Sequence, residues 1–323
     1  MQKRKLLALC VLASLAISPV VAQQPYPNKP IKLVVGFAPG GSADIAARLA
    51  AEKLTMELKQ PVIVENRPGA GGNIGAEMVA RAAPDGYTLL MASTSQIVIN
   101  PSLYKKMSFS PIKDLVPVIL VQNEHNLMVV TPSVPAKTLK EFIAYVKSAP
   151  TAVTFASPGQ GTPAHLAGEL MNQAAGLKML HVPYKGTSAA VSDLLAGHVT
   201  MAIDNMPALL PQVKAGRLRA LGVASEHRAT AAPEIPTMDE AGLAGYVVPA
   251  WKGVMAPSGT PRPIIDKLNT AMNKMLAMPD VRQRMIDLGA EPAGGTPEKF
   301  GELIKVDTSK WAAVVKSIGT SLD

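Results

Sequence analysis

Cysteine is almost absent from this sequence, because only Cys10 occurs among 323 residues. A single thiol excludes a disulfide scaffold and any metal cluster that needs several cysteines. Aromatic residues make up only 4% of the chain, so platforms on which nucleic-acid bases stack are scarce. The sequence also has no Lys/Arg run of the kind that binds nucleic acid, and we expect no nucleic-acid partner.

Apolar residues are plentiful by contrast, at 48% of the chain against 17% charged residues. That balance supplies a hydrophobic core and excludes an intrinsically disordered protein. At about 100 to 200 residues per domain, the length favours two domains.

The first 22 residues have the pattern of a secretory signal peptide. A basic stretch, Lys3-Arg4-Lys5, precedes an apolar run at residues 6–17, and Val20-Val21-Ala22 has small residues at the positions before a cleavage site. The run is too short for a membrane span, which needs about 20 apolar residues. We therefore expect cleavage after Ala22 and a periplasmic, soluble mature protein. Its charge would be 29 basic against 24 acidic residues, a balance that weakly favours anionic small molecules.

Along the mature chain, short β-rich runs alternate with helical stretches, which predicts α/β architecture with mainly parallel sheets. The expected strands are 31–37, 61–65, 88–92, 116–130 with a break near 122–126, 153–156, 179–182, 199–203, 218–224 and 247–256. The expected helices are 40–58, 74–82, 138–147, 163–173, 189–195, 261–278, 279–288 and 297–318.

The strand-like segments near 116–130 and 247–256 flank a block that reads as a complete α/β unit. Two chain crossings between two lobes would give this pattern, and one larger sheet is the alternative. We expect a first lobe of residues 23–122 plus 250–323 and a second lobe of residues 123–249.

Two loops between a strand and a helix are the main candidate binding segments. In the first, Phe37-Ala38-Pro39-Gly40-Gly41-Ser42-Ala43-Asp44, two glycines let the backbone come close to a ligand, and free N–H groups at a helix start bind anions. Asp44 is either a cap for those N–H groups, which we favour, or a partner for a ligand ammonium group. The alternative is an ordinary turn.

The second loop is Ser157-Pro158-Gly159-Gln160-Gly161-Thr162-Pro163, in which Thr162 before Pro163 is an N-cap signal and His165 lies in the first turn. One such loop in each lobe would face the other across a cleft.

Two further clusters are candidates for the walls of that cleft. Ser93-Thr94-Ser95-Gln96 follows a strand, where ligands of open α/β sheets lie, although a polar turn is the alternative. In Pro183-Tyr184-Lys185-Gly186-Thr187-Ser188, Tyr184 offers an apolar wall with a polar tip, and Thr187 or Ser188 a helix cap.

Sequence patterns for several chemistries are missing. No Walker phosphate loop, G-x-S-x-G elbow or histidine pair with metal spacing occurs, so we expect neither cofactor nor metal. A Ser/His/Asp triad stays open, because its members come together only in space. A secreted hydrolase would use Ser95 or Ser157 with His165 or His181.

Ordered matches along the whole mature chain carry a family resemblance. They include Tyr26-Pro27, Pro39-Gly40-Gly41, Glu65-Asn66-Arg67-Pro68-Gly69-Ala70-Gly71-Gly72, Pro84-Asp85-Gly86-Tyr87-Thr88, His165-Leu166, Val182-Pro183-Tyr184-Lys185-Gly186, Ala215-Gly216-Arg217-Leu218-Arg219-Ala220, Pro236-Thr237, Glu240-Ala241-Gly242 and Trp251. By these the chain resembles the Bug (TctC-type) extracytoplasmic solute-binding proteins of tripartite tricarboxylate transporters.

The resemblance implies a two-lobed periplasmic-binding-protein fold, type II-like, that closes on a small carboxylate. Di- and tricarboxylates, amino acids and aromatic acids are all open. Carried over, the ligand would be held by Phe37 to Ser42 and Ser157 to Thr162, with Ser93 to Gln96, Tyr184 to Thr187 and Asp204 as walls. Membrane transporter subunits are the expected transient partners of a monomeric receptor, and a receptor for a signalling partner is the alternative.

Overall fold

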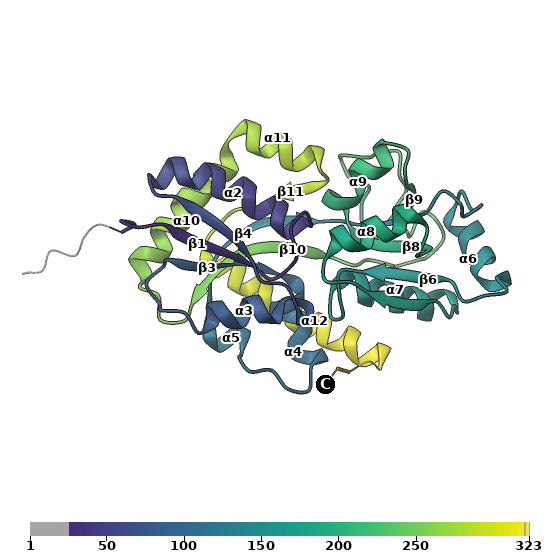
Figure 1. Cartoon of the computed structure of the whole chain (residues 1–323), viewed down its shortest axis with the longest axis horizontal. Coiled ribbons are helices and arrows are strands. Elements are labelled where there is room, and N and C mark those ends of the chain that lie inside the picture. The colour runs from purple at the N-terminus through teal and green to yellow at the C-terminus, as the bar shows by residue number, and fades with distance from the viewer. Residues whose placement is uncertain (1–25, 320, 323) are drawn as a thin grey trace, which may run out of the picture.

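A computed structural model describes residues 26–319, 321 and 322 and arranges them as two lobes side by side (Figure 1). Each lobe is one β-sheet with helices on both faces. The predicted signal peptide lies outside the described residues. Among the helices that are described, none has both the length and the apolar character needed to cross a membrane.

The first lobe contains a six-stranded sheet in the order β11-β4-β10-β3-β1-β2. Its strands are β1 (Ile31–Val35), β2 (Val62–Asn66), β3 (Thr88–Ser93), β4 (Leu115–Glu124), β10 (Ala250–Pro257) and β11 (Ala290–Pro292). Around them lie α2 (Ser42–Leu58), α3 (Asn73–Ala80), α4 (Asn100–Leu103), α5 (Pro111–Asp114), α10 (Arg262–Ala277), α11 (Pro279–Asp287) and α12 (Pro297–Ile318). A 3-10 turn at Ala70–Gly72 and a π-helix at Ser95–Ile99 complete the lobe.

The second lobe contains a five-stranded sheet in the order β7-β6-β8-β5-β9. Its strands are β5 (Asn126–Val130), β6 (Thr154–Ser157), β7 (Leu180–Pro183), β8 (Met201–Asn205) and β9 (Arg219–Val223). Its helices are α6 (Leu139–Ser148), α7 (Pro163–Ala175), α8 (Thr187–Ala196) and α9 (Met206–Lys214).

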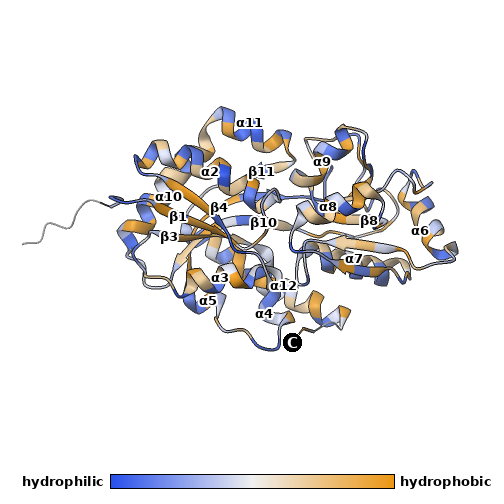
Figure 2. Cartoon of the chain, in the orientation of Figure 1, coloured by the Kyte–Doolittle hydropathy of each residue, from blue (hydrophilic) through white to orange (hydrophobic). Residues whose placement is uncertain are grey.

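Apolar runs and helix signals account for most of these elements. Thr138, Thr162 and Thr296 each cap a helix, as a threonine before a helical pattern predicts. Figure 2 shows the strands of the first lobe as mostly hydrophobic and the outer faces of the surrounding helices as hydrophilic, which is the pattern of a buried sheet.

Three sequence-based expectations need correction. The sheets are mixed, not mainly parallel, because β4, β10, β11, β5 and β9 pair antiparallel with their neighbours. The strand expected at 247–256 begins only at Ala250. Short elements with weak periodicity, among them the π-helix, α9 and β11, were not predicted.

The chain crosses between the sheets twice, and the two crossings lie side by side. β4 passes into β5 through His125, and the chain returns into β10 with Ala250 opposite Glu124. Asn126 Nδ2 donates to the carbonyl oxygen of Val248 at 2.7 Å, which ties one crossing to the other. Since β4 pairs in the first sheet as far as Glu124, the strand ladder runs two residues past the predicted lobe boundary at 122, and the boundaries themselves stay a prediction.

Helix α12 is fastened to the first sheet by a buried polar contact. Trp251 Nε1 donates to Asp307 Oδ2 at 2.8 Å, and the Trp251 ring meets Phe300 edge-on with 5.1 Å between ring centroids. Trp251 and Phe300 are fully buried and Asp307 nearly so. Burial raises the pKa of Asp307, while the hydrogen bond from Trp251 opposes that rise. The indole donor, together with the positive charge of Lys310, partly compensates the burial of this carboxyl group.

We expect Trp251→Phe to lower the free energy of unfolding by about 1–3 kcal/mol, because the Asp307 carboxyl loses its buried donor. Urea unfolding followed by circular dichroism measures this. Asp307→Asn is the matched control, since its amide oxygen still accepts from the indole, and we expect a smaller loss. A Trp251→Phe protein as stable as the Asp307→Asn control would contradict the assigned role of the contact.

Candidate functional site

A cleft with both polar and apolar walls lies where the two lobes meet. The space between its lining atoms is about 400 Å³, a volume that includes the open solvent at its mouth. Its lining consists of Phe37, Gly41, Ser42, Ala43, Ser93, Thr94, Ser95, Pro158, Thr162, Pro163, Thr187, Asp204, Asn205 and Lys252. Most of these residues stand at or just beyond the carboxyl ends of β1, β3, β6 and β8, which is where open α/β sheets bind ligands.

Helices α2 and α8 begin in this cleft without a side-chain cap. The residue before each is a glycine, Gly41 and Gly186, and no side chain of that capping residue accepts a hydrogen bond from the first turn. A Cβ placed on Gly41 would lie 3.6 Å from the Thr187 side chain, so the two helix starts face one another. Exposed N–H groups at the positive end of a helix attract anions, and here two such ends converge from different lobes.

Helix α7 begins differently, because N–H groups of its preceding loop and first turn are hydrogen-bonded to side chains of the same segment. Thr162 Oγ1 accepts from the His165 N–H at 3.3 Å, and the Gly161 N–H donates to His165 Nδ1 at 3.3 Å. The Gly159 N–H donates to Ser157 Oγ at 3.2 Å. These N–H groups are therefore engaged within the second lobe. From this loop, only Pro158, Thr162 and Pro163 line the cleft.

Asp44 acts as a cap for its own loop. Its Oδ2 accepts from the Gly40 N–H and from Arg48 Nε, both at 2.9 Å, and its Oδ1 accepts from Asn66 Nδ2 at 3.0 Å. Burial alone would raise the pKa of Asp44, but the hydrogen bonds from Arg48, Gly40 and Asn66 outweigh it and lower that pKa. The ionised carboxylate shapes the loop from behind and does not line the cleft.

In the polar cluster after β3, some side chains bond within the protein core and others line the cleft. Gln96 turns inward, where its Oε1 accepts from the Ser93 N–H at 2.8 Å and from Ser93 Oγ at 2.6 Å. Thr94 Oγ1 accepts from the Trp251 N–H at 2.9 Å. Ser95 is 1% exposed, lines the cleft and makes no side-chain hydrogen bond to another described residue. Its hydroxyl is thus free for a ligand.

The segment before α8 holds the lobes together. Tyr184 donates its hydroxyl proton to Asp193 Oδ2 at 2.7 Å, so its polar tip is engaged within the second lobe. Ser188 Oγ donates to the Pro39 carbonyl oxygen at 2.9 Å, and a Cβ on Gly186 would stand 2.9 Å from that of Ala38. The lobes are therefore in direct contact at this edge of the cleft.

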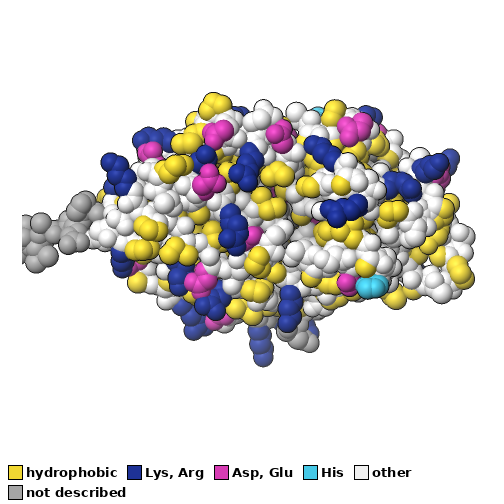
Figure 3. All heavy atoms as spheres, turned by 45° about the horizontal axis from the view of Figure 1, so that its top comes forward, with side chains coloured by type: hydrophobic (Ala, Val, Ile, Leu, Met, Phe, Trp, Pro, Cys, Tyr) yellow, Lys and Arg dark blue, Asp and Glu magenta, His cyan; other side chains and the backbone are white. Residues whose placement is uncertain are grey.

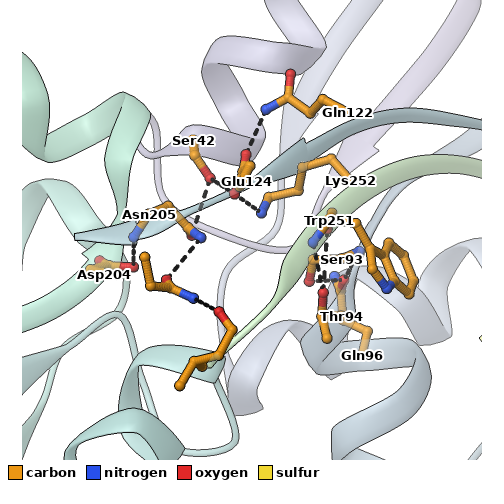
Figure 4. A network of polar contacts seen from close by, with 12 residues as sticks. Ser42, Ser93, Thr94, Gln96, Gln122, Glu124, Asp204, Asn205, Trp251 and Lys252 are labelled. Atoms are coloured by element: carbon orange, nitrogen blue, oxygen red, sulfur yellow. Dashed lines mark hydrogen bonds and ion pairs between the residues drawn. The ribbon is translucent and has the colours of Figure 1, made fainter. Parts of the chain in front are cut away.

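A buried ion pair at the cleft was not predicted from the sequence. Lys252 Nζ lies 2.6 Å from Glu124 Oε2, which also accepts from Ser42 Oγ at 3.1 Å (Figure 4). Gln122 Nε2 donates to the other carboxylate oxygen at 2.6 Å. Lys252 and Glu124 stand 128 positions apart in the chain, so no local motif signals their pairing. Only the adjacency of β4 and β10 brings them together.

Asp204, at the end of β8, is the second buried acid of the site. It is 3% exposed, and no cation of the described residues lies within ion-pair distance of it. Burial raises its pKa to about 6, and Glu124 adds to that effect. The hydrogen bonds from the Asn205 N–H, at 2.7 Å, and from Thr187 oppose the rise, as does the positive charge of Lys252.

His165 and His181 form a stacked pair in the second lobe, with 4.2 Å between ring centroids. Burial lowers the pKa of His165 to about 4 and that of His181 to about 3, so both imidazoles are neutral at neutral pH. Ser157 Oγ lies 2.6 Å from His181 Nε2, but Ser157 is fully buried and neither residue lines the cleft. This pair belongs to the packing of the lobe.

The structure thus separates the predicted site residues into two groups. Those that line the cleft are Phe37, Gly41, Ser42, Ser93, Thr94, Ser95, Thr162, Thr187 and Asp204. Those that do not line it are Ala38, Gly40, Asp44, Gln96, Ser157, Gly159, Gly161, His165, Tyr184 and Gly186. Pro158, within the expected segment 157–162, also lines the cleft, and the structure adds Ala43, Pro163, Asn205 and Lys252. Contact of the lining residues with a ligand stays a prediction.

The positions of charged and metal-ligating side chains indicate which kind of ligand this cleft suits. Within residues 26–319, 321 and 322, no three His, Asp or Glu side chains are grouped to hold a metal ion. On the face in Figure 3, Lys and Arg side chains are scattered over both lobes and form no continuous basic patch. The cleft contains the acceptor Asp204 but also two uncapped helix starts, the hydroxyl of Ser95 and the ammonium group of Lys252, and these donors suit binding of a small anion.

Comparison with known proteins agrees with the fold and shows the family. The family model described as "Tripartite tricarboxylate transporter family receptor" matches residues 46–320. The protein BugT of Bordetella pertussis is 40% identical over 312 residues, which cover 96% of each chain.

Among solved structures, the periplasmic binding protein BugD is 37% identical with a TM-score of 0.88 and covers 92% of this chain and 99% of its own. R. palustris Rpa4515 with adipate is 34% identical, with a TM-score of 0.90 and the same coverage. MatC of Rhodopseudomonas palustris with bound malate is 35% identical, with a TM-score of 0.86 over 90% of this chain and 100% of its own. The two-lobed α/β fold is therefore that of periplasmic binding proteins.

We expect the ionised Asp204 carboxylate to lower the stability of the folded protein at neutral pH. Its pKa is about 6 in the folded state against an ordinary 3.8, so the folded state holds the proton more tightly. Ionisation of Asp204 leaves the free energy of unfolding almost unaffected near pH 3 and lowers it as pH rises from about 4 to 6. At pH 7 the decrease in the free energy of unfolding is about 3 kcal/mol.

The variant Asp204→Asn should remove that pH dependence. Urea unfolding should give equal stabilities for the variant and the native protein near pH 3 and a more stable variant at pH 7. The exposed Asp266→Asn is the control and should follow the native protein within about 0.5 kcal/mol. An Asp204→Asn protein that is less stable than the native protein at pH 7 would refute the assignment.

Proposed function

The chain belongs to the tripartite tricarboxylate transporter receptor family, and we propose that it is a periplasmic receptor for a small carboxylate. It captures the acid between its two lobes and delivers it, as a monomer, to a membrane transporter of the tripartite tricarboxylate type. The facing, uncapped starts of α2 and α8 carry this proposal.

Each helix start presents N–H groups that need an acceptor. Ser42 and Thr187 are the first residues of α2 and α8, and they line the cleft from opposite lobes. A carboxylate has two oxygens and about four acceptor sites, so one group can accept from both helices at once. Hydrogen bonds to an ionised acceptor are shorter and stronger than neutral ones. Binding one carboxylate therefore favours the state in which the lobes are together.

Relatives support a carboxylate as the ligand class. Rpa4515 and MatC, which share the fold at about one third identity, are described with adipate and with malate, both small dicarboxylates. The cleft of this chain has few aromatic side chains, Phe37 being the one that lines it. A compact aliphatic acid fits that lining better than a large aromatic ligand.

A thermal-shift screen of aliphatic di- and tricarboxylates, amino acids and aromatic acids tests the receptor proposal. A ligand at 100 times its dissociation constant should stabilise the protein by about 2.7 kcal/mol. Mass spectrometry of the purified protein identifies any acid that is already bound. A folded, ligand-free sample that responds to no carboxylate would refute the proposal.

Lobe closure depends on a close approach at Gly161. Its φ is +77°, and a Cβ there would collide with Asn100 Oδ1 of the first lobe. We expect Gly161→Ala to weaken carboxylate binding by about tenfold or more, because the methyl group keeps the lobes apart; a tenfold loss is about 1.4 kcal/mol. Isothermal titration calorimetry with the best acid of the screen measures the change.

Gly197→Ala is the matched control for backbone strain. Gly197 has a φ of +78°, almost the same as Gly161, but a Cβ there meets no atom within 4 Å. Both variants should lose similar stability from the left-handed conformation. Equal affinities in the two variants would show that the contact at Asn100 does not limit closure.

A further inference from the structure

We infer that Lys252 selects ligands with a second carboxylate, by serving as its counter-ion in the closed cleft. The inference rests on the proposed carboxylate-receptor function and names the residue that binds the second carboxylate of the acid. Lys252 belongs to β10, is 4% exposed and lines the cleft together with Ser95 and Asp204.

The ammonium group of Lys252 is only partly satisfied by the protein. A lysine has three N–H donors, and among the described residues Glu124 Oε2 is the one acceptor within hydrogen-bond distance of Nζ. Figure 4 shows the side chain extending from β10 toward Glu124. A buried cation with unused donors is costly unless another acceptor reaches it. A ligand oxygen in the cleft is such an acceptor.

Glu124 positions Lys252 and is itself closed to the ligand. Its side chain is fully buried and does not line the cleft. Its two oxygens already accept from Lys252, Ser42 and Gln122. The carboxylate therefore holds the ammonium group in place, while the open side of that group faces the cleft.

The two anchoring points lie close together and define the ligand. Ser42 Oγ and Lys252 Nζ both bond to Glu124 Oε2, at 3.1 and 2.6 Å, so one short diacid can reach both points. One carboxylate binds at the starts of α2 and α8, beside Ser42 and Thr187, which leaves Lys252 and the free hydroxyl of Ser95 for the other end. A charge-assisted hydrogen bond to Lys252 discriminates a carboxylate from a neutral amide of the same shape. A ligand ammonium at this end would be repelled by Lys252.

The test compares each of succinate, glutarate and adipate with its own monoamide by isothermal titration calorimetry. A monoamide keeps the size and most hydrogen bonds of the acid but lacks one charge. For the dicarboxylate of best-fitting length, we expect about tenfold or greater preference over its monoamide in the native protein.

The informative variant is the double substitution Lys252→Met with Glu124→Gln. It removes the ion pair as a unit, so no buried charge is left without its partner. We expect the preference to fall to about twofold or less, with the affinity for the monoamide almost unchanged. The matched control removes the exposed pair Lys274 and Glu57, 2.7 Å apart, by Lys274→Met with Glu57→Gln and should keep the native preference.

The outcomes separate this inference from the function on which it rests. Equal binding of acid and monoamide by the native protein would overturn the role of Lys252 and leave the carboxylate receptor intact. A preference that survives in the double variant would do the same. If no carboxylate of the wider screen bound, both proposals would fall. Equal binding of acid and monoamide by the native protein overturns the inference even if the double variant does not fold.

Discussion

The N–H groups at a helix start must find acceptors, and the helices of this protein differ in whether a side chain supplies one. Helices α6, α7 and α12 each begin after a threonine whose hydroxyl accepts from the first turn. Helices α2 and α8 begin after Gly41 and Gly186, which have no side chain to offer. Helices α3, α9, α10 and α11 also begin without a side-chain cap, but the starts of α2 and α8 face one another across the cleft between the lobes. An acceptor from outside the chain then becomes part of what holds the lobes together.

The charged side chains of the cleft also differ in how completely they are hydrogen-bonded within the protein. Glu124 is fully surrounded by donors, whereas Lys252 and Asp204 retain capacity for further bonds. Both residues are buried beside the helix starts, and the pKa of Asp204 is raised as a result. Groups of this kind lower the stability of the empty fold, and Lys252 gains an acceptor when an acid binds. The site therefore favours binding at the expense of stability, as functional sites commonly do.

The loop 157–162 shows which features of a binding segment a sequence predicts and which it leaves to the folded structure. Thr162 before Pro163 predicted the cap of α7, and the structure has it. The same residues were expected to offer N–H groups to the ligand, but His165 and Ser157 take up those of Gly161 and Gly159. A glycine-rich turn permits a close approach of ligand and backbone without requiring one. Which N–H groups stay free depends on how the side chains around the loop are folded against it.

The sequence alone determined the α/β class, the order of most strands and helices and the family, because these depend on periodicity, local capping and motifs that stand together in the chain. It also located the first loop, since Gly40 and Gly41 between a buried strand and a helix are a local signal. Only the tertiary structure decided that α8 opposes α2, that β4 and β10 pair, and that Lys252 thereby meets Glu124 across 128 positions. Such long-range pairings arise from sheet order and lobe contact, which no single stretch of sequence encodes.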